Sequence, residues 1–236
     1  MRKAAFPAFC LLLSASLLPS RSAAQAASRF APEVRAFVKE DAPMIALTHV
    51  RIIEGTGAVP RADQPVITNG KISAFDDAAS TKIPEGAKVL DLGGRTIIPG
   101  LVGMHDHMYY PSPGGVTSIR TTGSMEPYAD LQLKRDIDDG KMAGPRIHVT
   151  GPHLEGPGAF ALQMHQLKDT ENARRTVAFW IEQGVTSFKA YMNITPDELS
   201  AAVQTAHAHG IQVTGTFVPS VFAKRQTWAL IIWNTA

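Results

Sequence analysis

The sequence predicts an α/β fold in which about five strands of a partial TIM (β/α)8 barrel follow a small β-sandwich segment. Three observations predict it. Short strand patterns separated by glycine and asparagine turns fill residues 44–100. Strand and helix patterns then alternate over residues 101–215, which is typical of parallel strands joined by right-handed crossovers. Between the two regions, an apolar run ends in His105-Asp106-His107.

Residues 1–26 have the pattern of a secretory signal peptide. A basic start precedes an apolar centre, and Ala24-Gln-Ala26 is a small-residue cleavage pattern. We therefore expect an exported protein, periplasmic or secreted, without stable membrane insertion once the signal is cleaved. An uncleaved membrane anchor is the alternative. Cleavage would also remove Cys10, the single cysteine, so that no disulfide and no thiolate ligand would remain.

Residues 27–43 form a polar connector with a short helical stretch near residues 32–39. The β-sandwich segment, residues 44–100, begins after it. Asn69-Gly70 marks a tight turn between two of its strands. The strands that the patterns predict here are 45–53, 64–68, 71–75 and 88–92, followed by one continuous strand from Arg95 into the apolar run.

The barrel segment, residues 101–215, changes to a strand-helix alternation. Glycine and proline fill residues 151–158, which we expect to be a loop. In a barrel of this kind the chemistry lies at the carboxyl ends of the strands. The predicted strands are 115–120, 146–150, 185–189 and 211–215, and the predicted helices are 126–142, 172–183 and 195–209.

His105 and His107 are the first candidate metal ligands. Side chains two residues apart in a strand share a face, so the two imidazoles would point the same way and Asp106 the opposite way. Neutral imidazole suits zinc and other late first-row ions. Two surface or hydrogen-bonded histidines are the alternative.

The run Pro99-Gly100-Leu101-Val102, with His105 and His107, resembles the first barrel strand of the amidohydrolase superfamily, and the resemblance covers about residues 44–215. The imidazolonepropionase-like and dipeptidase-like branches are the most similar. The sequence departs at Gly103, where many members carry an acidic residue. The resemblance implies a metal-dependent hydrolase of carbon–nitrogen bonds in small amides, cyclic amides or dipeptides. It also implies two divalent ions per intact site, zinc for preference, that activate the attacking water.

Lys189, at the end of the predicted strand 185–189, is the third candidate ligand. A bare ammonium beside histidines and divalent metals inside a barrel would be strongly disfavoured. The resemblance implies that the amine is carboxylated, which converts a cation into an anion able to bridge two metals. A lysine that pairs with a carboxylate or reaches solvent is the alternative.

Three further residues are candidates for substrate binding. His153 and His165 flank the glycine-rich loop after the third barrel strand, and Tyr191 follows Lys189. Loops at this end of a barrel build substrate pockets. No catalytic residue is identified, because the resemblance places the proton-shuttling aspartate at the end of strand eight.

The sequence also lacks the histidines that the resemblance implies after strands five and six. Residues 101–236 are fewer than the roughly 250 of a (β/α)8 barrel. Residues 216–236 contain two of the three tryptophans and no acidic residue. Codons can be chosen for this tail so that a one-base shift gives a histidine directly after Gly215 and a later Leu-Glu-His-Gly. We therefore expect a truncated, frameshifted amidohydrolase that is poorly soluble and impaired; an authentic short protein is the alternative.

Other functions are less favoured. The formal net charge is +2, and no basic stripe suggests nucleic-acid binding. No Gly-x-Ser-x-Gly motif indicates a serine hydrolase. The second candidate function is a non-catalytic exported fragment that binds no metal.

Overall fold

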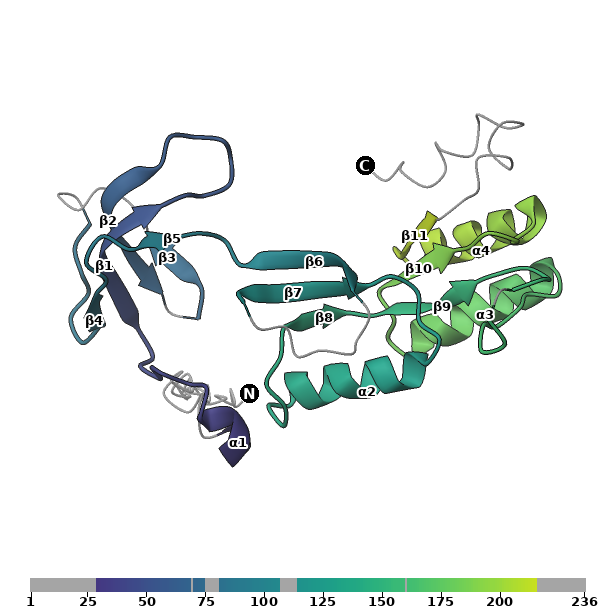
Figure 1. The fold of residues 1–236 in the computed structure, drawn as a ribbon, viewed down its shortest axis with the longest axis horizontal. Coiled ribbons are helices and arrows are strands. Elements are labelled where there is room, and N and C mark those ends of the chain that lie inside the picture. Colours follow the sequence, from purple (N-terminus) through teal and green to yellow (C-terminus); the bar gives the residue numbers. More distant parts are fainter. Residues whose placement is uncertain (1–28, 69, 75–80, 107–113, 160, 216–236) are drawn as a thin grey trace, which may run out of the picture.

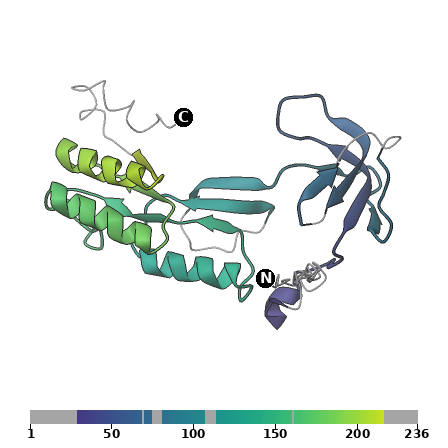
Figure 2. The same cartoon turned by 180° about the vertical axis from the view of Figure 1, so that it is seen from behind.

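The computed structural model describes residues 29–68, 70–74, 81–106, 114–159 and 161–215. Figures 1 and 2 show a small sheet at one end of the molecule, with parallel strands and the helices that cover them at the other. The predicted signal peptide, His107 and the tail 216–236 lie outside the described residues. No helix in the described ranges is long and apolar enough to cross a membrane.

The N-terminal region is one mixed sheet preceded by a short helix. Its strand order is β3-β2-β1-β4, and β5 also pairs with β1. The pairs β1–β2 and β2–β3 are antiparallel, whereas β4 and β5 run parallel to β1. In the part of the chain that the structure describes, this region supplies a single layer, which is half of the expected sandwich. The elements are α1 (Pro32–Arg35), β1 (Ile45–Ile52), β2 (Arg61–Thr68), β3 (Ile72–Ala74), β4 (Lys88–Asp91) and β5 (Thr96–Ile97).

The run from Arg95 into the apolar segment is not the one continuous strand that the sequence predicted. β5 pairs with β1, and a new strand, β6 (Leu101–Asp106), pairs with β7 (Val116–Thr121) in another sheet. Pro99, which has no backbone N–H to donate, lies at the break. Gly100 follows it, and a Cβ there would lie 2.0 Å from Oγ1 of Thr117. The close approach of the neighbouring strand therefore requires glycine.

Six parallel strands follow in the described residues, where the sequence predicted five, because the chain breaks at Val149 into β8 and β9. They form two sheets, β6-β7-β8 and β11-β10-β9. Only Val149 separates β8 from β9, and its carbonyl accepts a hydrogen bond from Thr186 N at 2.8 Å. Among the described residues the strands do not close into a barrel, since β6 and β11 each pair on one side only. The remaining strands are β8 (Arg146–His148), β9 (Thr150–Leu154), β10 (Ser187–Ala190) and β11 (Gln212–Gly215).

The expected loop 151–158 begins later than predicted, because residues 151–154 belong to β9. Gly151 is needed there for packing. A Cβ on it would lie 2.7 Å from the ring of Phe188 on the neighbouring strand. The glycine and proline that suggested a loop are therefore part of a buried strand.

Three helices connect and cover the parallel strands. They are α2 (Pro127–Asp138), α3 (Thr170–Glu182) and α4 (Pro196–Ala208). Asp169 caps α3 by accepting from Asn172 N, and Thr195 with Glu198 forms a capping box on α4. Their buried faces and the strands share one apolar core, which includes Ile119, Leu131, Val149, Leu154, Val177, Phe188, Leu199 and Val213.

Candidate functional site

Three candidate residues meet at the carboxyl ends of β9 and β10. His153 and Lys189 are register partners on the two strands, and they are 7% and 5% exposed. The Nζ atom of Lys189 lies 5.3 Å from the centre of the Tyr191 ring. The rings of His153 and Tyr191 meet edge to face with their centres 5.0 Å apart. We call these three residues the strand-end cluster.

Lys189 is a buried amine on β10. No ion pair to it occurs among the described residues. Burial removes water from its ammonium and lowers the pKa of Lys189 below its usual range, and the positive charge of Arg120 lowers this pKa further. The described residues therefore show neither of the alternatives for the Lys189 side chain, which were a pair with a carboxylate and free contact with solvent. A lowered pKa favours the neutral amine, which is the form that can react with carbon dioxide.

Hydrogen bonds that involve side-chain hydroxyl groups hold the strands together beside the cluster. Oγ1 of Thr121 on β7 accepts from Thr150 N on β9 at 2.8 Å. Oγ1 of Thr150 donates to the carbonyl of Thr121 and lies 2.8 Å from Oγ of Ser187 on β10. All three side chains are buried. This chain of contacts fixes the spacing of the three strands that carry Arg120, His153 and Lys189.

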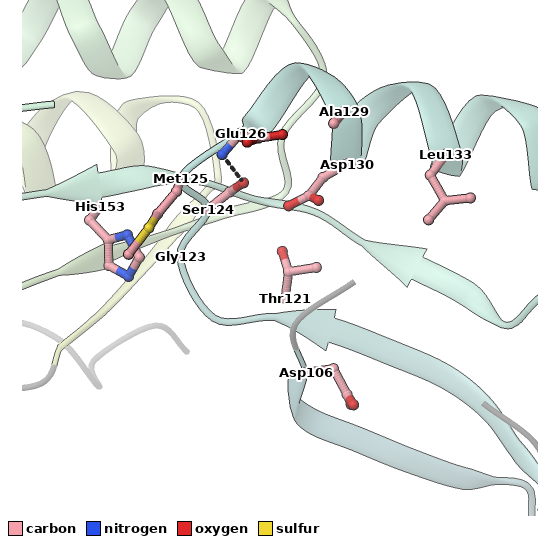
Figure 3. A pocket seen from close by; sticks show the side chains of 10 residues that line it. All are labelled: Asp106, Thr121, Gly123, Ser124, Met125, Glu126, Ala129, Asp130, Leu133 and His153. Atoms are coloured by element: carbon pink, nitrogen blue, oxygen red, sulfur yellow. Dashed lines mark hydrogen bonds between the residues drawn. The ribbon is translucent and has the colours of Figure 1, made fainter. Parts of the chain in front are cut away.

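A pocket of about 280 Å³ adjoins the cluster and shares His153 with it. Figure 3 shows His153 at one end of the pocket and Leu133, from α2, at the other. Ser124 closes the turn before α2 by accepting from Glu126 N at 3.1 Å. The pocket lining is acidic and partly apolar, and it consists of Asp106, Thr121, Gly123, Ser124, Met125, Glu126, Ala129, Asp130, Leu133 and His153.

Gly123 fixes the position of the His153 ring. Its φ is +80°, a conformation that side chains rarely adopt, and a Cβ there would lie 2.3 Å from Nε2 of His153. The imidazole therefore packs directly on the glycine backbone. A side chain at position 123 would have to displace the ring.

We expect Gly123→Ala to move the His153 imidazole and to cost about 1 kcal/mol of stability, because alanine is strained at positive φ. Gly184→Ala is the matched control, since Gly184 has a φ of +96° and open space around its Cβ position. Gly123→Ala should lose more stability in urea unfolding than Gly184→Ala, because it also displaces the buried imidazole, and only Gly123→Ala should shift the NMR resonances of His153. Equal shifts in the two variants would contradict the contact.

The other candidate residues are not joined to the cluster by a described contact. His105 is exposed at the end of β6, in the other parallel sheet, and His107 lies outside the described residues. His165 is exposed and its Nε2 lies 3.3 Å from Oγ1 of Thr176 on α3. Within the described ranges, no three His, Cys, Asp or Glu side chains gather closely enough to hold a metal ion. The metal-ligand set and the substrate role of His165 stay predictions.

Three residues of the site were missed by sequence reasoning. Arg120 lies near Lys189, Gly123 supports His153, and Glu155 is fully buried directly after β9. Arg120 and Glu155 each lie near the carboxyl end of a parallel strand, and this place in the sequence could have indicated that they belong to the site. The importance of Gly123 depends on a contact with a residue 30 positions later, and no local pattern carries that information.

The site thus defines a class of α/β protein with buried ionisable groups at the ends of parallel strands. Comparisons with known proteins indicate which proteins of this class the chain resembles. No family model matches the chain. The chain is 24% identical over 203 residues to an enamidase from Eubacterium barkeri, a match that covers 72% of this chain and 49% of the enamidase. It is 44% identical over 56 residues to a dihydroorotase from Syntrophus aciditrophicus, covering 24% of this chain and 13% of that protein.

Solved structures give a similar result. A protein from Bifidobacterium longum described as a prolidase has a TM-score of 0.65 and 25% identity, over 74% of this chain and 49% of that one. An amidohydrolase has a TM-score of 0.66 and 18% identity, over 77% of this chain and 58% of that one. These relatives and structures point to the amidohydrolase superfamily, in agreement with the resemblance seen in the sequence. The chain spans about half the length of the enamidase and of the prolidase.

Proposed function

We propose that this chain is a metal-dependent hydrolase that cleaves carbon–nitrogen bonds in small amides, cyclic amides or dipeptides. The observation that supports this most is Lys189, an amine that is 5% exposed at a strand end beside His153. The names of its relatives, an enamidase, a dihydroorotase and a prolidase, support the same class of reaction. In this proposal the parallel strands are part of a (β/α)8 barrel.

The proposed metal ligands are His105, His107 and carboxylated Lys189. The residues that the structure describes fit this assignment at Lys189, whose lowered pKa favours the reactive neutral amine. The amine nitrogen attacks the carbon of carbon dioxide. A nitrogen–carbon bond forms while one carbon–oxygen π bond opens to give a carboxylate oxygen, and one amine proton passes to solvent. A bound divalent ion, zinc for preference, would supply an activated water and polarise the substrate carbonyl.

The substrate is proposed to lie against His153 and Tyr191. Both rings adjoin Lys189, and His153 also lines the pocket. An aromatic ring and an imidazole can hold the substrate by packing and by one hydrogen bond, which orients the amide toward the strand ends. Export through the signal 1–26 belongs to the same proposal.

The test is to purify the chain, measure its zinc content and assay dipeptide, lactam and imide hydrolysis. We expect zinc uptake and slow hydrolysis that a chelator abolishes and that added zinc restores. Neither zinc nor product in any assay would overturn the proposal and favour a non-catalytic fragment.

A further inference from the structure

Glu155 is a fully buried carboxylate to which the proposed reaction assigns no role. It follows β9 directly, two residues after His153, and is 0% exposed. In the described part of the chain no lysine, arginine or histidine forms an ion pair with it. A buried carboxylate is costly unless its hydrogen bonds compensate. Its contacts therefore indicate what it does.

One oxygen of Glu155 holds together two loops that are far apart in sequence. Oε1 accepts from Asn193 N at 2.6 Å and from Gly156 N at 2.9 Å. Oε2 is buried and has no hydrogen-bond partner among the described residues. The first bond joins the end of β9 to the loop between β10 and α4, and it spans 38 positions.

The same two loops meet at several other points around this carboxylate. A Cβ on Gly156 would lie 1.9 Å from the carbonyl oxygen of Asn193. The side chain of Asn193 donates to the carbonyl of Gly158 at 3.0 Å. The β10–α4 loop begins at Tyr191, whose N–H donates to the carbonyl of Leu154 at 2.9 Å. Ile194 N donates to the carbonyl of Tyr191 at 3.4 Å, so Asn193 lies inside a turn that begins at Tyr191.

We propose that Glu155 is a positioning residue that holds Tyr191 against His153 and Lys189 by fastening the β10–α4 loop to the end of β9. An effect of Glu155 on substrate binding rests on the proposed function. The effect of Glu155 on the position of Tyr191 does not. The carboxylate acts through Oε1 as an acceptor for backbone N–H groups. Glutamine keeps that acceptor, and alanine removes it.

The test uses the whole chain without metal or substrate. Glu155→Ala should accelerate hydrogen exchange at the Asn193 amide at least ~10-fold, the scale of one lost hydrogen bond. It should also shift the ¹⁹F resonance of 3-fluorotyrosine at Tyr191, which Tyr191→Phe assigns. Glu155→Gln should retain both wild-type values. Glu182→Ala, at an exposed position on α3, is the control and should change neither.

A second variant tests the same contact from the opposite side. Gly156→Ala leaves the carboxylate intact but places a methyl group against the Asn193 carbonyl. It should shift the Tyr191 resonance as Glu155→Ala does. If Glu155→Ala does not fold, Glu155→Gln and Gly156→Ala decide the question. Unchanged exchange and resonance in Glu155→Ala, loss of protection in Glu155→Gln, or no shift in Gly156→Ala would each overturn the proposal.

Where the chain hydrolyses an amide, Glu155→Ala should raise KM about 10-fold, with kcat little changed, because Tyr191 contacts substrate but not the reacting atoms. Glu155→Gln should restore KM. The absence of turnover in the wild-type chain would count against the proposed function alone, since the exchange and ¹⁹F measurements need no reaction.

Discussion

Lys189→Met is expected to abolish zinc uptake and to reduce any amide hydrolysis by more than 100-fold. The proposed carboxylated lysine supplies an anionic ligand, and its loss should exceed the roughly 10- to 100-fold effect of removing an outer-shell partner of a metal ligand. Methionine has a similar length and carries no charge to be desolvated at this buried position. The variant should therefore fold, so that lost zinc binding reports the ligand and not the fold. Calorimetric zinc titration and product assays measure both effects.

Lys168→Met is the control for this experiment. Lys168 is exposed immediately before the N-cap of α3, and its side chain forms no ion pair among the described residues. Zinc uptake by this control should match the wild-type chain. Undiminished zinc binding by Lys189→Met would remove Lys189 from the ligand set, and with it the main support for the proposed function.

Phe188→Ala is expected to destabilise the chain by about 3–5 kcal/mol, the usual cost of deleting a buried aromatic side chain. Phe188 is 0% exposed on β10, where its ring packs on Gly151 and the apolar core shared by strands and helices. Gly151 has no side chain that could move into the space left by the Phe188 ring, so the cavity stays unfilled. Urea unfolding followed by circular dichroism measures the loss.

Phe179→Ala is the matched control, because this ring is 43% exposed on α3. Its contact with Trp180 is an edge-to-face pair with ring centres 5.3 Å apart, so we expect a loss near 1 kcal/mol or less. Equal losses for the two variants would mean that the strand-helix core does not carry the stability of this region.

The order and type of the elements could be predicted because side-chain periodicity is a local property. The alternation after residue 100 predicted the parallel strands except β9, most of which was expected to be a loop, and it predicted the three helices. The end of α2 was placed too late, since the pattern continued to residue 142. The helix ends at Asp138, and Gly140, with a φ of +72°, lies directly after the C-cap residue.

The candidate site could be predicted in part. The resemblance suggested Lys189, the loop after the third barrel strand suggested His153, and Tyr191 was chosen because it follows Lys189. The three side chains lie together in the structure, and their roles stay predictions. The contact of His165 with Thr176 could not be anticipated, because it depends on how one loop returns to α3. The roles of Gly123 and Glu155 depend on single atoms of distant residues in the same way.

The sequence by itself determined the α/β class, the superfamily resemblance and the strand ends that carry ionisable groups, because periodicity and short motifs are written in neighbouring residues. Tertiary structure alone decided where the run after Arg95 divides between two sheets, which ring rests on Gly123, and which loop Glu155 holds. Those outcomes depend on close packing between segments tens of residues apart, and close packing is a property of the assembled interior.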